Sequence, residues 1–256
     1  MSLQVDGIPQ RESMGPDKRR DALVKKVGPM LPITPATVIC YGRIGSGKSS
    51  VLYSWLKNLF PKYYDESIIF CASSDSRDAF EALPQKSITF LTDYDDSAFT
   101  QYVEQLKEDQ LERMAKGKDP LNIFIGFDDV VFSEAIGGKK PSMVERLMLI
   151  CRHELNATVF ICVQHSKQVN PAMRNNSIYH IICGVQRNDL EKIASEHCNH
   201  ITESAFIDLY NKIQAKGKHQ FILVDYKATE DARFRHNFDK IIRITNSELN
   251  ELAETR

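Results

Sequence analysis

The sequence predicts an α/β fold in which a mostly parallel central sheet carries helices on both faces. Two observations lead to this prediction. Short runs of β-branched and aromatic residues alternate along the chain with segments in which apolar residues recur at helical spacing. In addition, an apolar run that ends at Tyr41 leads directly into residues 42–49, which have the spacing G-x-x-x-x-G-K-S, and then into a helical pattern.

The first half of the chain alternates between predicted strands and predicted helices. A helix is expected over 49–60, because Val51 begins a series of apolar residues at helical spacing. A long amphipathic helix is expected over 97–116, where Gly117 and Pro120 supply the stop. The strands are rich in β-branched, aromatic and other apolar residues and cover 37–41, 67–71, 88–91 and 122–127. The last of them is apolar on both faces, as a central parallel strand must be.

The second half continues the alternation. A flexible segment over 134–141 is followed by an apolar helix, and two further helical patterns come later. The predicted helices cover 142–152, 189–197 and 204–215, and the predicted strands cover 158–163, 180–183, 220–226 and 240–244. Strands and helices in this order imply right-handed crossovers and therefore a mostly parallel sheet.

The chain divides into an N-terminal arm, residues 1–33, and a single domain, residues 34–256. The arm is rich in Gly, Pro and basic residues and shows little sustained periodicity. Two interpretations of the arm remain open: it wraps a neighbouring subunit or touches a phosphate backbone, or it is a disordered terminus.

Composition excludes several classes of function. The formal charge is −1, from 33 basic and 34 acidic residues, so no overall field draws the protein to nucleic acid or to a membrane. Contact with nucleic acid must therefore be local. The six cysteines lack C-x-x-C spacing, which predicts core thiols in a reducing compartment. No apolar run reaches the roughly 18 residues that cross a bilayer, and the N-terminus is too charged for a signal peptide. We expect a soluble, intracellular protein.

Residues 42–49 form a phosphate-binding loop in the strand-to-helix setting that its chemistry requires. Gly42 and Gly47 let backbone N–H groups turn toward phosphates, while the helix N-terminus adds its positive end. Lys48 reaches the β- and γ-phosphates, and the Ser49 hydroxyl is a ligand for Mg²⁺. We therefore expect ATP and Mg²⁺ as cofactors. The predicted nucleotide-binding residues are Gly42, Gly45, Ser46, Gly47, Lys48, Ser49 and Ser50.

Polar residues at the ends of two later strands are candidates for the chemistry. Asp128 follows a buried strand and is predicted to hold Mg²⁺, and Asp129 is predicted to polarise the attacking water. Gln164 is a candidate sensor of the γ-phosphate, because an amide can donate to phosphate and accept from water. The alternatives are that the two acids cap the next turn and that the glutamine has no role.

Catalysis of phosphoryl transfer also calls for a cation, and the candidates are Arg152 and Arg174. Either one can be supplied by a neighbouring subunit. The alternative for each is an ordinary arginine at a helix end or in a loop.

Candidates for contact with DNA are weaker. Lys139 and Lys140 lie in the Gly-Gly-Lys-Lys segment after the Asp128 strand, where nucleotide-driven movement would reach them. An ordinary solvated loop is the alternative. Weaker candidates of the same kind are Lys116, Lys118, Lys216 and Lys218. Four histidines show no coherent pattern of metal ligands, so no zinc site is predicted: His153, His165, His197 and His200.

Taken together, these motifs resemble those of the DNA-packaging ATPases of poxviruses, other nucleocytoplasmic large DNA viruses and virophages, a branch of the FtsK/HerA superfamily. The resemblance runs from about residue 37 to about residue 183. It rests on the ordered combination of residues 42–49, Phe127-Asp128-Asp129, Arg152-His153, Gln164-His165 and Arg174-Asn175-Asn176.

This resemblance implies a RecA-like core that assembles into a ring of five or six copies and moves double-stranded DNA into a preformed capsid with energy from ATP. It implies that Asp128 binds the metal, Asp129 is the catalytic acid and Gln164 is the sensor. It favours Arg152 over Arg174 as the arginine that acts in trans. The partners it implies are double-stranded DNA, further copies of the chain and a viral capsid protein. The expected location is the virus assembly site in the host cytoplasm, or the virion.

Two other functions remain open. A small P-loop kinase would need an arginine-rich lid over both substrates, and the sequence has no compact arginine cluster. A nucleotide-dependent assembly or scaffolding protein would bind ATP without useful hydrolysis, and Asp129 together with a trans-acting arginine argues against it.

Overall fold

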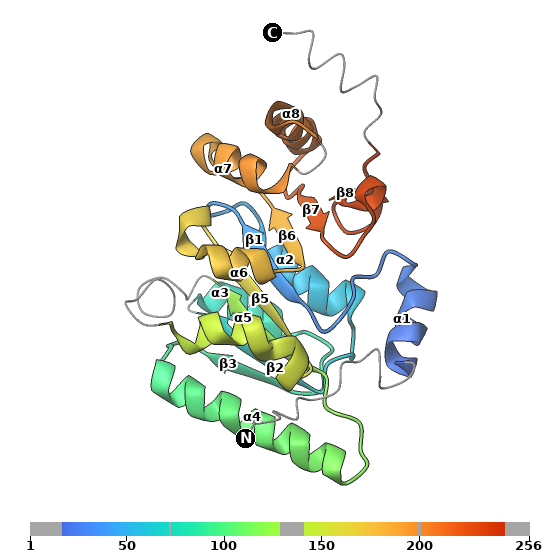
Figure 1. The fold of residues 1–256 in the computed structure, drawn as a ribbon, viewed down its shortest axis with the longest axis vertical. Coiled ribbons are helices and arrows are strands. Elements are labelled where there is room, and N and C mark those ends of the chain that lie inside the picture. Colours follow the sequence, from blue (N-terminus) through green and yellow to red (C-terminus); the bar gives the residue numbers. More distant parts are fainter. Residues whose placement is uncertain (1–16, 72, 129–140, 199–200, 244–256) are drawn as a thin grey trace, which may run out of the picture.

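A nine-stranded sheet forms the centre of the computed structural model, which describes residues 17–71, 73–128, 141–198 and 201–243 (Figure 1). The strand order is β3-β2-β4-β5-β1-β6-β7-β8-β9. Strands β3 to β6 in this order are parallel, whereas β7, β8 and β9 pair antiparallel at one edge. The strands are β1 (Thr37–Tyr41), β2 (Glu66–Cys71), β3 (Ile88–Leu91), β4 (Ile123–Asp128), β5 (Ala157–Val163), β6 (Tyr179–Ile182), β7 (Ile222–Asp225), β8 (Phe234–His236) and β9 (Lys240–Ile241). The predicted α/β fold with a mostly parallel sheet is confirmed.

Helices cover both faces of the sheet, and each face has its own apolar core. Alternate residues of β1 show this directly, because Ile39 and Tyr41 join one core while Val38 and Cys40 join the other. The first core is covered by α4 (Asp96–Ala115), α5 (Met143–Glu154), α6 (Pro171–Asn176), α7 (Arg187–His197) and α8 (Glu203–Gln214). The second is covered by α1 (Lys18–Val27), α2 (Lys48–Ser54) with its π-helical continuation Trp55–Leu59, and α3 (Ser74–Glu81).

The central strands are buried along their whole length. Every residue of β1, β4 and β5 is buried, as predicted for parallel strands with helices on both sides. Gly126 is the one residue of β4 without a side chain. A Cβ built there would lie 2.9 Å from the ring of Phe124 and 3.4 Å from Leu52 of α2. The glycine therefore lets α2 pack closely on β4.

Several helices begin at side chains that satisfy the first free backbone N–H groups. Ser142 and Glu145 form a reciprocal capping box at the start of α5, where the sequence predicted the helix. Asn170 accepts from the Met173 N–H at 2.8 Å, and Pro171 is the first residue of α6. Neither α6 nor α3 was predicted, because both are short and bury few residues.

Helix α1 lies within the segment expected to be an arm, and no helix was predicted there because Leu23 is its only buried apolar residue. The helix is attached to the domain by polar contacts. Arg19 donates to both carboxylate oxygens of Asp65, at 2.8 and 2.9 Å, and the Tyr63 hydroxyl donates to Asp17 at 2.8 Å. Burial acts to raise the pKa of Asp65, but hydrogen bonds from Arg19 and Lys86 lower it to about 2.

Two buried histidines lie next to each other, His180 in β6 and His197 at the end of α7. His180 Nδ1 is 3.0 Å from the Tyr41 hydroxyl, and His197 Nδ1 is 2.6 Å from the Tyr226 hydroxyl. The two imidazole centroids are 4.1 Å apart. Burial lowers the pKa of His180 well below its ordinary value, and the neighbouring His197 adds to the effect. Burial, followed by the charge of Arg174, lowers the pKa of His197 to about 4.

All six cysteines are free thiols, five of them buried and Cys198 half-buried. Each helix in the described part of the chain is too short or too polar to span a bilayer.

The two histidines predict a loss of stability on mild acidification. A group whose pKa is lower in the folded state is protonated more readily when unfolded, so stability falls as the pH drops below about 6.5. Because His236 also has a pKa lowered by burial, it acts in the same direction. The free energy of unfolding should fall by roughly 4 kcal/mol between about pH 7 and pH 5, where Asp65 does not yet titrate. Urea unfolding at both pH values measures the loss of stability, and His197→Gln should reduce that loss. If the variant lost as much stability between the two pH values as the wild type, the assignment of the effect to His197 would be wrong.

Candidate active site

The phosphate-binding loop connects β1 to α2 and is held from both sides. Gly42 N–H donates to the Val163 carbonyl of β5 at 3.0 Å, and Arg43 N–H donates to the Gly184 carbonyl after β6 at 3.0 Å. Gly45 and Gly47 have φ angles of +75° and +98°, which only glycine adopts without strain. The loop therefore contains two left-handed glycines, and its start is hydrogen-bonded to the chain at the ends of β5 and β6, the two strands on either side of β1.

Helix α2 begins in this loop. Its N-cap is Gly47, so no N-cap side chain accepts a hydrogen bond from the first turn, where the positive end of the helix lies. The Ser46 hydroxyl is buried without a hydrogen-bond partner in the described part of the chain, and it occupies the place where Gly42 would carry a Cβ. A buried hydroxyl without a partner beside the uncapped start of a helix is an arrangement that suits a phosphate group.

Lys48 lies inside the loop rather than in solvent. Only 5% of its surface is exposed, and its Nζ donates to the Arg43 carbonyl at 3.3 Å. A buried ammonium at the start of a helix favours an anionic group in the loop. The residues present thus fit a nucleotide polyphosphate.

Ser49 and Asp128 meet across the mouth of the loop. Asp128 is the last residue of β4 and is 2% exposed, and the Ser49 hydroxyl donates to its Oδ1 at 3.0 Å. One hydroxyl and one carboxylate side by side are the oxygen ligands that Mg²⁺ prefers. This donor set fits the predicted magnesium ion.

Gln164 lies between these two elements. It follows β5, which is the strand between β1 and β4 in the sheet, and it is half-buried. The chain after it is fixed by Gln168, whose side-chain oxygen accepts from the Gln164 and His165 N–H groups at 2.9 and 2.8 Å. The geometry places Gln164 at the same sheet edge as the loop and Asp128.

Asp189 supports this turn and was missed by the sequence analysis. Its carboxylate accepts from Ser166 N–H and Ser166 Oγ at 3.2 and 3.1 Å, and it is 2.8 Å from His165 Nδ1. The sequence gives no sign that Asp189 holds this turn, because Asp189 and the residues it contacts belong to different elements.

Other predicted residues lie outside the described part of the chain. They are Asp129, Lys139 and Lys140, so their roles stay predictions.

Arg174 is part of the buried framework. It is 8% exposed, donates to the carbonyls of Ser166 and Val169, and forms a 2.8 Å ion pair with Glu196 of α7. These contacts favour a structural role for Arg174.

Arg152 has a different position. It is partly exposed in the last turn of α5, the helix that returns from the end of β4 to the start of β5. Helix α5 therefore ends at the sheet edge opposite the phosphate loop. Arg152 therefore lies at the opposite end of the sheet from the phosphate loop of its own chain, and its role stays a prediction.

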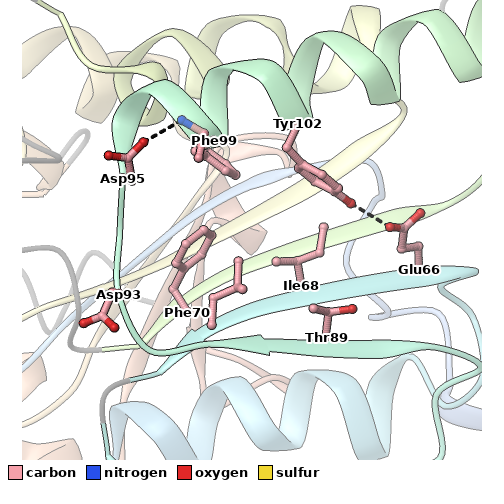
Figure 2. A pocket seen from close by; sticks show the side chains of 10 residues that line it. Glu66, Ile68, Phe70, Thr89, Asp93, Asp95, Phe99 and Tyr102 are labelled. Carbon is pink, nitrogen blue, oxygen red and sulfur yellow. Dashed lines mark hydrogen bonds between the residues drawn. The ribbon is translucent and has the colours of Figure 1, made fainter.

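Two cavities lie on opposite faces of the sheet, one beside α2 and the other beside α4. One of about 280 Å³ is lined by Ser49, Ser50 and Tyr53 of α2 and by three residues of α3, so it adjoins the predicted site. The other, of about 290 Å³, lies between α4 and the strands β2 and β3, with Phe70 and Phe99 at one end and Glu66 bonded to Tyr102 at the other (Figure 2). It shares no residue with the loop.

The two arginines give a paired prediction. Arg174→Ala should lower the free energy of unfolding by about 3 kcal/mol, because Glu196 and two carbonyls lose their partner. Arg152→Ala should change it by less than about 0.5 kcal/mol. Urea unfolding monitored by circular dichroism measures the free energy of unfolding of both variants. Equal losses of stability would contradict the assignment of a structural role to Arg174 alone.

A family model described as Poxvirus A32 protein matches residues 30–250. No curated protein matches the chain in sequence. Among solved structures, the chain is similar to B204, the DNA-packaging ATPase from Sulfolobus turreted icosahedral virus. The identity is 14%, the TM-score is 0.55, and 82% of this chain and 100% of that chain are covered.

Two further structures share the fold. The genome packaging NTPase B204 from Sulfolobus turreted icosahedral virus 2, in complex with ATP-gammaS, has 14% identity and a TM-score of 0.52, with 81% of this chain and 98% of that chain covered. The cytoplasmic domain of EssC has 15% identity and a TM-score of 0.51, with 86% of this chain and 45% of that chain covered. At such identities the likeness shows the fold.

The family match covers most of the chain and includes every motif on which the resemblance rests. The resemblance is thereby confirmed. The chain belongs to the poxvirus A32 protein family of genome-packaging ATPases.

Proposed function

We propose that the chain hydrolyses ATP at the loop between β1 and α2 and uses the energy to move double-stranded viral DNA into preformed capsids. The observation that carries this proposal is the contact of the Ser49 hydroxyl with the buried Asp128 carboxylate beside the phosphate loop. This contact would bring the phosphate-binding loop and the proposed magnesium ligands together at the carboxyl ends of the parallel strands.

Each residue of the site has its own proposed role. The N–H groups of the loop and Lys48 bind the phosphates, and Ser49 and Asp128 would hold Mg²⁺. The metal, when bound, neutralises charge on the phosphate oxygens. Asp129 is proposed to accept the proton of the attacking water, and Gln164 to orient that water or sense the γ-phosphate.

A neighbouring copy is proposed to complete the site. Arg152 lies at the end of the sheet opposite the loop of its own chain, and a ring of five or six copies is proposed to bring it to the loop of the next copy. An arginine supplied in this way is worth about 10³ to 10⁵ in rate, because it neutralises charge that develops only in the transition state.

DNA and a viral capsid protein are the proposed further partners. Because the formal charge is −1, contact with the DNA backbone must come from local basic residues. Lys116 and Lys118 are exposed after α4, and Lys139 and Lys140 are proposed to act from the loop that follows β4. The proposed location is the virus assembly site in the host cytoplasm, or the virion.

Steady-state ATPase activity with and without double-stranded DNA tests the function as a whole. A DNA motor should be stimulated by DNA. A small-molecule kinase would instead need an acceptor, and a scaffold would respond to neither.

The roles of Lys48 and Asp129 are separable. Lys48→Ala should weaken ATP binding by about 100-fold, because it removes a cation that bonds directly to phosphate. Asp129→Asn should leave the Kd for ATP within about threefold and lower kcat by about 10² to 10⁴. Equilibrium binding and steady-state hydrolysis measure the two effects. Wild-type turnover in Asp129→Asn would refute the assignment of the base.

The trans role of Arg152 can be tested by mixing two inactive variants. Arg152→Ala should bind ATP but lose about 10³-fold or more in kcat, whereas Lys48→Ala retains Arg152 but binds ATP too weakly to turn it over at ATP concentrations that saturate the wild type. In mixed rings, an intact loop then meets an intact arginine, so mixing should restore activity. Two variants that stay inactive when mixed, while forming mixed oligomers, would exclude this arginine.

A further inference from the structure

The loop between α8 and β7 lies directly against the phosphate-binding loop. A Cβ built at Gly47 would lie 2.5 Å from Nδ1 of His219 and 3.2 Å from its Cγ. The base of this loop is closed by Gln214, whose amide donates to the Gln220 carbonyl at 2.7 Å. The same Gln214 approaches Gly184, the residue whose carbonyl holds Arg43. The end of α8 thus forms one wall of the site.

His219 is held in an unusual conformation with its polar atoms unused. Its φ is +59°, a left-handed value that is uncommon outside glycine, although Asn, Asp and His adopt it more often than other residues. Within the described part of the chain, the exposed imidazole makes no hydrogen bond, ion pair or ring contact. His219 lies beside the phosphate-binding loop, and its ring nitrogens make no hydrogen bond within the described residues. Its backbone conformation is of the sparsely populated kind that clusters at ligand sites. The residue is therefore suited to contact a ligand.

The chemistry around His219 indicates an anionic ligand. Lys216 and Lys218 are exposed in the same loop, and Arg43 is exposed in the phosphate loop opposite. The two lysines were weak candidates for contact with DNA, but their loop lies at the phosphate cradle. Cationic and N–H donors on both sides of Gly47 therefore surround the place where phosphate is expected.

We propose that His219 is a further nucleotide-binding residue, whose imidazole N–H donates a hydrogen bond to a phosphate oxygen of the nucleotide bound at Gly47 and Lys48. The proposal rests on the proposed function of this site. It assigns to the C-terminal part of the chain a direct share in nucleotide binding, which the phosphate-loop motif alone does not contain.

Three substitutions at one position separate bonding from packing. His219→Ala removes the side chain, His219→Leu fills the space without a donor, and His219→Gln retains an N–H donor of similar reach. Lys212→Ala, an exposed basic residue of α8, is the matched control. Calorimetry of the full chain measures the affinity for ATP and for inorganic tripolyphosphate, without turnover.

The Ala and Leu variants should bind both ligands about tenfold more weakly or worse, as expected for a lost hydrogen bond to a charged group. The Gln variant should stay within about threefold of wild type, and Lys212→Ala should be unchanged. Wild-type affinity in His219→Leu would overturn the proposal, because packing alone would then suffice. A loss for ATP but not for tripolyphosphate would overturn the phosphate contact.

The failure of this inference is distinguishable from failure of the proposed function. If the wild-type chain does not bind ATP, or binds it as well with Lys48→Ala, the site itself is wrong. If Lys48→Ala loses binding while all His219 variants bind normally, only the role of His219 is refuted.

Discussion

The hydrogen bond from Ser49 to Asp128 joins two parts of the chain on which the proposed chemistry depends. Ser49 lies in the first turn of α2 and Asp128 at the end of β4, and β5 lies between their strands in the sheet. The two side chains meet because parallel strands end at the same edge, where ligands of open α/β sheets bind. Strand order, rather than sequence proximity, thus brings together the pair proposed to bind the metal.

The same edge also collects residues from the antiparallel side of the sheet. Strand β6 pairs with β7, and the loop that leads into β7 carries His219 to Gly47. The phosphate loop therefore has Gln164 and Asp128 on one flank and the α8–β7 loop on the other. The antiparallel extension is part of the site and not only an addition to the sheet.

The sequence was sufficient for the parallel core and for the residues of the phosphate loop, because both leave strong local patterns. Strands such as β4 are continuous apolar runs, and the motif at residues 42–49 has fixed spacing. Helices α1 and α3 were missed because they bury few apolar residues and so lack periodicity. The contacts of Asp189 and His219 could not be predicted, because they join residues far apart in sequence and depend on side-chain positions.

Gly126 has a consequence for how force is generated. The absence of a side chain there brings Leu52 of α2 and the ring of Phe124 onto the β4 backbone, so that the helix and the strand are packed without a gap. The helix that follows the nucleotide cradle and the strand that carries Asp128 are consequently in close contact, and close-packed interiors transmit displacement with little compression. Any stroke produced on splitting ATP would be expressed at the borders of this packed pair, in connecting segments and between adjacent copies.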